Sequence, residues 1–153
     1  METSKRKIID SFRDEYFFLS NFYRCPVMYM GHEFTCAEAA FQAAKNPSRV
    51  WEFLTLGPSE AKKLGRNVLL RGGWEYIKNM VMRRVVYSKF SQNRFLLEKL
   101  LSTGDAVLIE GNDWGDTYWG QVDGEGENNL GKILMETRAE LKLWHPEFVL
   151  QEE

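Results

Sequence analysis

The spacing of hydrophobic residues changes along the chain from an extended pattern to a helical one near residue 35. Before that point, residues 8–12 and 17–23 have the pattern of short extended segments, separated by a charged turn at residues 13–15. Residues 27–34 then predict a β-hairpin, because Gly31 and His32 stand where a tight turn is needed and glycine accepts a positive φ.

Helical spacing dominates the rest of the chain. Thr35 and Glu38 have the spacing of a capping box and precede an alanine-rich run to Lys45, so a helix is expected there, ended by Asn46 and Pro47. The pattern at 74–90 is the longest amphipathic stretch and should pack centrally. Further helices are predicted at about 48–56, 58–65, 95–101 and 130–144, the second with Pro58 in its first turn and the last followed by Pro146.

One short apolar run lies among the predicted helices. Residues 106–109 predict a buried strand that carries Glu110 at its end. The following segment, 111–129, contains five glycines, which disfavour regular structure and permit close approach of the backbone to a ligand. We therefore expect residues 111–129 to form the functional loop.

Length and composition indicate a globular protein. The 153 residues are 44% hydrophobic and 14% aromatic, enough for one core in one domain. We expect an α+β fold: a single compact, mostly helical domain over residues 1–153, with its core at about 8–144 and short basic N-terminal and acidic C-terminal tails. The N-terminal strands and residues 106–109 should form a small antiparallel β-sheet.

Charge and cysteine content exclude several classes of function. The net charge of −2 gives no global basic field for nonspecific nucleic-acid binding. Cys25, Cys36, His32 and His145 do not have the spacing of metal ligands, so no metal or other cofactor is expected. The N-terminus lacks the apolar segment of a signal peptide, and no apolar run approaches the ~18 residues of a membrane span. A cytoplasmic protein with reduced thiols is expected.

Two separate parts of the sequence carry acidic and aromatic residues suited to one chemistry. Glu38 lies in the alanine-rich helix, and Asp116 lies just before Trp119 in the glycine-rich loop. A carboxylate can stabilise the positive charge that develops on a ribose carbon, and an indole can stack on the departing base. The pair therefore points to cleavage of a sugar–base bond, in a pocket between the helix and the loop.

Each carboxylate also has a structural interpretation. Glu38 could bond the backbone at the start of its helix, as the fourth residue of the capping box. Gln42 and Lys45 share its helical face, which could be a solvated stripe or a pocket wall where Lys45 binds phosphate. Asp116 could be an ordinary turn former. Glu110 could take the place of Asp116 as the second carboxylate of the site, and a purely structural role for it is equally compatible with the sequence.

The remaining candidates would bind the base, the sugar or the phosphate. Trp119 is suited to stacking, whereas Trp74 also fits the core stripe of its helix. Phosphate could bind to an arginine or to free amides at the start of the last helix, at Asn129 and Gly131. Asn21 and Phe22 could complete the wall of the pocket. The arginines considered are Arg66, Arg71, Arg83 and Arg84.

Several segments together resemble the NADAR, or YbiA-like, family of N-glycosidases, over about residues 12–141. No single segment is specific for the family, but the order and spacing of all of them together are specific. The segments are Leu19-Ser20-Asn21-Phe22-Tyr23, Glu38 to Lys45, Gly72-Gly73-Trp74-Glu75, Met82, Lys89-Phe90, Thr103-Gly104, Glu110, Asp116-Thr117-Tyr118-Trp119-Gly120, Asn129-Leu130-Gly131 and Leu134-Met135.

The resemblance implies hydrolysis of an N-glycosidic bond in ribose-phosphate compounds. The implied substrates are early aminopyrimidine intermediates of riboflavin synthesis, or ADP-ribose attached to a nucleobase such as guanine in DNA. It favours the catalytic role of Glu38 and Asp116, and adds Tyr118 and Gly120 to the substrate-binding residues. The family commonly has His directly after the helix Glu, whereas this chain has Ala39.

Two other functions are compatible with the same residues. The pocket could bind ADP-ribose or NAD without turnover, a possibility that the missing His makes more serious. The aromatic residues around Trp119 could also form a protein-docking patch. The oligomeric state and the natural substrate are not fixed by the sequence.

Overall fold

The structure, a computed structural model, describes residues 5–150, which fall into two compact units. Unit 2 comprises residues 21–97, and unit 1 comprises residues up to 20 together with those from 98 onward. Residues 1–4 of the predicted basic tail and residues 151–153 of the acidic tail lie outside the described part. The single domain over 1–153 stays a prediction, and each unit is described by itself.

A β-hairpin opens unit 2, as the sequence predicted. Strands β2 (Arg24–Tyr29) and β3 (His32–Cys36) pair antiparallel, with Tyr29 opposite His32. Met30 and Gly31 form the turn with φ values of 53° and 75°. Two consecutive positive φ angles are typical of the hairpin turns whose twist matches that of the strands. His32 begins β3 instead of completing the turn.

Helix α1 (Ala37–Ala43) follows the hairpin directly, but its start differs from the prediction. Its N-cap is Cys36, whose Sγ accepts a hydrogen bond from the Ala39 amide at 3.4 Å. The Thr35 hydroxyl instead donates to the carbonyl of Leu56. The third residue after the cap is therefore Ala39, and the predicted capping box of Thr35 and Glu38 is wrong.

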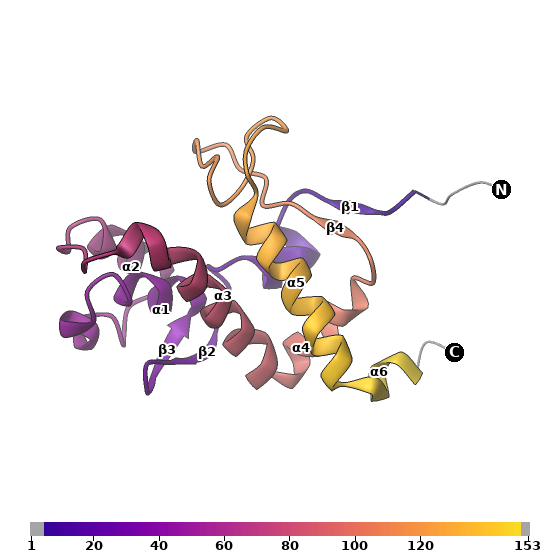
Figure 1. Cartoon of the computed structure of the whole chain (residues 1–153), viewed down its shortest axis with the longest axis horizontal. Coiled ribbons are helices and arrows are strands. Elements are labelled where there is room, and N and C mark those ends of the chain that lie inside the picture. Colours follow the sequence, from indigo (N-terminus) through magenta and orange to yellow (C-terminus); the bar gives the residue numbers. More distant parts are fainter. Residues whose placement is uncertain (1–4, 151–153) are drawn as a thin grey trace. The chain divides into compact units, whose positions relative to one another are not determined.

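The other elements of unit 2 pack around α1. Helix α2 (Pro58–Gly65) begins at Pro58 as predicted, and α3 (Trp74–Gln92) contains the predicted amphipathic stretch. The segment predicted as a helix at 48–56 is a shorter 3₁₀ helix, η2 (Pro47–Glu52). Helix α1 contacts α2, α3 and both strands of the hairpin (Figure 1). All seven residues of α1 are buried, so it is the central helix of this unit.

Unit 1 contains a second sheet, which corrects two sequence-based expectations. Strand β1 (Ile8–Ile9) pairs parallel with β4 (Val107–Leu108), so the strand predicted at 106–109 does not join the antiparallel hairpin. Parallel pairing requires a long connection, which the intervening chain supplies. The segment predicted as extended at 17–23 begins with the end of a 3₁₀ helix, η1 (Asp14–Leu19), which buries Phe18 and Leu19, and continues as a turn.

Helix α5 (Asn129–Trp144) packs against β4 in unit 1 (Figure 1). Its buried Arg138 donates to the Thr103 hydroxyl at 2.9 Å and to the Ala106 carbonyl at 2.8 Å. These bonds hold the chain just before β4 and so fix where that strand begins.

Two further helices complete the described chain. Helix α4 (Arg94–Ser102) begins in unit 2 and ends in unit 1, and the short α6 (Pro146–Leu150) follows α5. Helices with a small antiparallel hairpin confirm the predicted α+β class. Within residues 5–150, no helix is both long enough and apolar enough to cross a bilayer.

A lysine lies in the core of unit 2. Lys89 on α3 is fully buried, with its Nζ 5.6 Å from the centre of the Tyr23 ring and 4.9 Å from that of Phe90. Burial lowers the Lys89 pKa from 10.5 to about 8, although the nearby Cys25 and Cys36 act in the opposite direction. The ring faces partly compensate the buried charge by cation–π attraction.

Lys89 should make stability depend on pH. The pKa of Lys89 is about 8 in the folded protein and 10.5 in an unperturbed lysine. Between these two pH values the unfolded chain binds more protons than the folded protein. The free energy of unfolding therefore rises with pH over this range, by at most about 3 kcal/mol. Urea unfolding at about pH 7.5 and about pH 10 should show that Lys89→Met removes this rise.

Lys63→Met is the matched control for this prediction, because Lys63 is exposed on α2. It should leave the pH dependence as in the wild type. Burial raises the Cys25 pKa, which acts with the opposite sign, but Cys25 is present in every variant. Parallel pH profiles for wild type and Lys89→Met would contradict the prediction.

Candidate active site

Glu38 is the second residue of α1 and is 8% exposed. Its amide donates to the Asn21 carbonyl at 3.0 Å, which ties the start of the helix to the segment before the hairpin. Its Oε1 accepts a hydrogen bond from Gln42 Nε2 at 2.8 Å. A buried carboxylate is costly unless it is hydrogen-bonded, and the amide one turn along the helix supplies such a bond.

Lys45, just past the end of α1, lies in the electric field of several charged groups. Burial lowers its pKa, the carboxylate of Glu38 raises it, and the guanidinium of Arg66 lowers it. Weaker contributions come from Glu75, which raises the pKa, and Lys62, which lowers it. Glu38 and Gln42 are buried and Lys45 is half-buried, so the predicted helical face is not a solvated stripe.

Asn21 and Phe22 are held by neighbours within unit 2. Asn21 is 8% exposed, and its Nδ2 donates to Met82 Sδ at 3.3 Å. The Nζ of Lys62 lies 5.7 Å from the centre of the Phe22 ring. The segment before the hairpin is therefore connected to both α2 and α3.

The remaining candidates of unit 2 are aromatic or basic. Trp74 is 5% exposed and packs against Phe41, with ring centres 5.3 Å apart, as the core interpretation expects. The arginines considered for phosphate binding, Arg66, Arg71, Arg83 and Arg84, are all exposed. Of these, Arg66 is the one whose charge affects the Lys45 pKa.

In unit 1, Asp116 shapes the glycine-rich loop. Its Oδ1 accepts hydrogen bonds from the amides of Tyr118 at 3.1 Å and Trp119 at 2.9 Å. This is the bonding of a turn-forming aspartate, so the structural interpretation holds for this oxygen. The Tyr118 and Trp119 rings meet edge to face, with centres 4.8 Å apart.

Glu110 packs against Gly120 in the same loop. A Cβ atom on Gly120 would lie 1.8 Å from Glu110 Oε2 and 2.0 Å from the Glu110 carbonyl oxygen. The close backbone approach predicted for this glycine is therefore made by Glu110 itself. Glu110 Oε2 also accepts a hydrogen bond from Asn112 Nδ2 at 3.0 Å.

The start of α5 is occupied by the loop and is not open to an anion. The amide of Asn129 donates to the Tyr118 carbonyl at 3.2 Å, and that of Leu130 donates to the Trp119 carbonyl at 2.9 Å. The expectation that free amides at this helix start bind phosphate is thus wrong for these two. A Cβ on Gly131 would lie 2.1 Å from the Leu108 carbonyl oxygen, so this glycine permits close packing on β4.

Sequence reasoning missed two asparagines that hold the loop together. Asn112 Oδ1 accepts from the Asp116 amide at 3.0 Å, and its Nδ2 donates to the Asp116 carbonyl at 2.8 Å. Asn128, 5% exposed, accepts from the Glu110 amide and donates to the Leu108 carbonyl, both at 2.9 Å. Asn128 has a φ of 55°, and asparagine tolerates such angles better than most residues, which was the available signal.

The structure places the two groups of candidate residues in different units. Glu38 with Gln42 and Lys45 belongs to unit 2, whereas Asp116 with Trp119 belongs to unit 1. Within residues 5–150, no group of three or more His, Cys, Asp or Glu side chains could hold a metal ion. The roles of the two carboxylates are proposed below.

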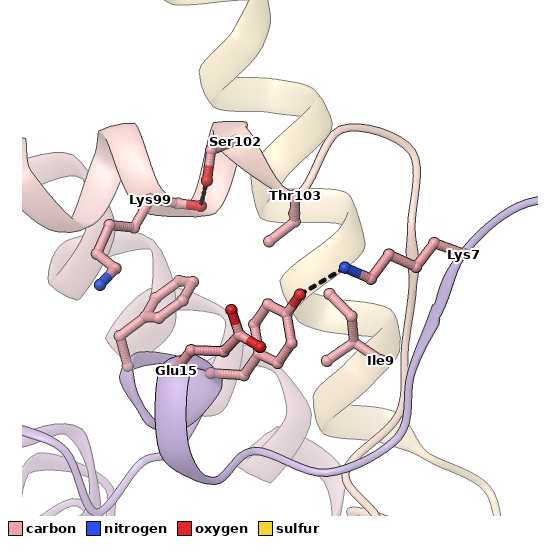
Figure 2. Close-up of a pocket in the computed structure, with 8 residues that line it drawn as sticks. Lys7, Ile9, Glu15, Lys99, Ser102 and Thr103 are labelled. Carbon is pink, nitrogen blue, oxygen red and sulfur yellow. Dashed lines mark hydrogen bonds between the residues drawn. The ribbon is translucent and has the colours of Figure 1, made fainter.

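A cavity of about 270 Å³ lies within unit 1 and contains none of the predicted site residues (Figure 2). It is lined by Lys7, Ile9, Glu15, Tyr16, Phe18, Lys99, Ser102 and Thr103. Four of its polar side chains bond to one another or to the backbone. Lys7 donates to the Tyr16 hydroxyl, Ser102 to the Lys99 carbonyl and Thr103 to the Leu100 carbonyl, each at 2.6 Å. With one carboxylate and no exposed base-stacking indole, this cavity is not the candidate site.

Comparison with solved structures defines the class of fold. The NMR structure of the Escherichia coli protein YbiA matches with a TM-score of 0.81 and 34% sequence identity, over 94% of this chain and 90% of that one. The described helices and hairpin therefore have the fold of YbiA.

Sequence comparison then identifies the family. The NADAR domain model matches residues 9–142, and the chain belongs to the NADAR domain family. "N-glycosidase YbiA" of Shigella flexneri serotype 5b is 36% identical over 85% of this chain and 84% of its own length. "Riboflavin biosynthesis protein VVA0006" of Vibrio vulnificus is 37% identical over 88% of this chain, but over only 38% of its own length. The chain is accordingly an enzyme of the N-glycosyl hydrolase class.

Asn128 should be among the most sensitive loop positions for stability. Asn128→Ala would leave the Glu110 amide and the Leu108 carbonyl without their side-chain partner, and would put alanine at a φ of 55°. We expect a loss of about 2–4 kcal/mol in the free energy of unfolding, measured by urea denaturation.

Asp123→Ala provides the control for this prediction. Asp123 lies in the same loop with a φ of 52° but is exposed, so its substitution isolates the backbone cost of about 1 kcal/mol. Equal losses for Asn128→Ala and Asp123→Ala would show that the buried hydrogen bonds of Asn128 contribute nothing.

Proposed function

We propose that this enzyme hydrolyses the N-glycosidic bond between a ribose phosphate and a nucleobase-like leaving group, with Glu38 and Asp116 as its catalytic residues. The observation that carries the proposal is the buried Glu38 carboxylate, held by Gln42 at 2.8 Å and electrostatically coupled to Lys45. Such a group is rare in a core without a functional reason.

The chemistry of the reaction suits this arrangement. The bond between the anomeric carbon and the base nitrogen breaks with both electrons going to nitrogen, which also gains a proton. Water adds its oxygen to the anomeric carbon and loses a proton. Glu38 would stabilise the oxocarbenium-like transition state or orient that water. Lys45 and Arg66 supply positive charge for the substrate phosphate.

The glycine-rich loop would hold the sugar and the base. Asp116 Oδ1 is committed to the amides of Tyr118 and Trp119, so its contribution would come through Oδ2, as an acceptor for ribose hydroxyls. The indole of Trp119 is half-buried, and stacking of a base on it would contribute about 1–3 kcal/mol.

Two types of leaving group remain in the proposal. The names of the Vibrio vulnificus relative and of "Riboflavin biosynthesis protein PYRR, chloroplastic" of maize favour an aminopyrimidine riboside phosphate of riboflavin synthesis. The net charge of −2 also favours a small metabolite over DNA. An ADP-ribosyl adduct of guanine is the second substrate to test.

Ala39 sets this chain apart from the common family pattern. Its side chain is fully buried, and its amide donates to Cys36 Sγ. Position 39 therefore offers no titratable group, and the proton for the leaving nitrogen must come from another residue or from water.

Glu38→Gln tests the proposed reaction. The substitution keeps the size of the side chain but removes its negative charge, so turnover should fall by about 10²–10⁴-fold while ligand affinity is retained. Release of the aminopyrimidine from its ribosyl phosphate, and separately of ADP-ribose from ADP-ribosylated guanine DNA, would be measured by chromatography. Binding would be measured by calorimetry.

Glu33→Gln is the control, because Glu33 is exposed on β3 in the same unit. Its activity should equal that of the wild type. Ligand binding by wild-type protein without hydrolysis of either substrate would contradict the proposed reaction and favour a pure binding module. Full activity of Glu38→Gln would contradict the role of Glu38.

A further inference from the structure

Gly65, the last residue of α2, lies directly against the side chain of Gln42. A Cβ atom built on Gly65 would lie 1.9 Å from Gln42 Oε1, 2.6 Å from its Cδ and 3.1 Å from its Cβ. Distances below about 3.0 Å do not occur between real atoms of these types, and the Cβ of Gln42 cannot rotate away. Any side chain at position 65 must therefore displace the amide of Gln42.

Backbone conformation does not explain this glycine. Gly65 is within a helix and is not among the residues with positive φ. At such a position alanine is usually more stable than glycine by about 0.5–1 kcal/mol. The room that Gly65 leaves for Gln42 is thus the physical reason for a glycine here.

The Gln42 amide is held in one orientation. The side chain is 6% exposed, and its Nε2 donates to Glu38 Oε1. Its Oε1, next to Gly65, is buried and has no hydrogen-bond partner among the described residues. A buried acceptor without a partner costs about 1–3 kcal/mol. An exchange of the two amide atoms would place an oxygen against the Glu38 carboxylate, so the donor must face Glu38.

We propose that Gly65 is a positioning residue: by leaving room for the Gln42 amide, it sets the position of the Glu38 carboxylate. This inference rests on the proposed function, because it assigns Gly65 to the reaction through Glu38. Reacting groups must be held within about 0.5 Å of their productive geometry, and a misplacement of about 1 Å can cost 10²-fold in rate.

The first test is Gly65→Ala. It should lower kcat about 10- to 100-fold with little change in KM, because the substrate-binding groups stay in place while the carboxylate moves. Gly72→Ala is the matched control, since a Cβ there would meet nothing within 4 Å, and it should behave as the wild type.

A double-mutant cycle separates positioning from a general loss of structure. Gln42→Ala removes the side chain with which the new methyl group collides, so adding Gly65→Ala in that background should not lower kcat further. In the same background Gly65→Ala should stabilise the protein slightly, because the collision is gone and alanine has a higher helix propensity than glycine. A 10- to 100-fold loss that persists in the Gln42→Ala background would overturn the proposal.

Gln42→Met provides a second test if Gly65→Ala folds poorly. Methionine has a similar length and fits beside Gly65 but cannot donate to Glu38, so kcat should fall about as much as in Gly65→Ala. Wild-type kcat in Gln42→Met would overturn the proposal.

Failure of the inference differs from failure of the proposed function. If Glu38→Gln is inactive and Gly65→Ala has wild-type kcat, the reaction stands and the role of Gly65 falls. If Glu38→Gln keeps wild-type turnover, the proposed function itself falls. The side-chain amide signal of Gln42 in a ¹⁵N NMR spectrum gives a readout independent of activity: it should move in Gly65→Ala and stay in Gly72→Ala, and an unmoved signal in Gly65→Ala contradicts the collision.

Discussion

The burial of α1 is the constraint on which the rest of unit 2 depends. All seven residues of this helix are buried, including Glu38 and Gln42, so water cannot supply all the hydrogen bonds that a charged group needs there. The helix therefore has to carry its own donor, and spacing of four residues brings the Gln42 amide to the Glu38 carboxylate. Four of the remaining five positions are small alanines, which let α2, α3 and the hairpin approach closely.

In unit 1 the polar groups obtain their hydrogen bonds in a different way. Its acidic residues lie in a loop, where side-chain amides and backbone groups replace the regular hydrogen bonds of a helix or strand. Asn112 and Asn128 bind the backbone at several points, and Asp116 accepts two amides. A loop held in this way can be ordered without a hydrophobic core of its own, because its polar backbone groups are satisfied.

Local signals in the sequence were sufficient for some elements and not for others. The hairpin at Gly31, the start of α2 at Pro58 and the long helix α3 were predicted because turn chemistry and periodicity act within a few residues. The predicted N-cap of α1 was wrong because the sulfur of Cys36, a weak acceptor, takes the place of the usual side-chain oxygen. The predicted partner of β4 was wrong. In the structure β4 pairs with β1, and two residues per strand carry no signal for a partner about a hundred positions away.

The candidate site shows the same division. Its residue types could be predicted, since a carboxylate beside an amide and a lysine at helical spacing indicates one face of α1. The supporting residues could not. Nothing in the local pattern around Gly65 connects it to Gln42, because the contact is between two helices and depends on the absence of a side chain. For Asn112 and Asn128 the sequence carries no more than the general tolerance of asparagine for positive φ, which does not reveal their hydrogen-bond partners.

The two carboxylates are held by different groups, and this difference bears on the roles proposed for them. Asp116 Oδ1 accepts two backbone amides, so its carboxylate is part of the loop's own framework. Glu38 accepts from a side-chain amide that packing against Gly65 keeps in one orientation. A reacting group has to be held in its productive geometry by side chains that packing has oriented. This reasoning supports the proposal that Glu38 acts on the reacting carbon, whereas Asp116 would hold the sugar.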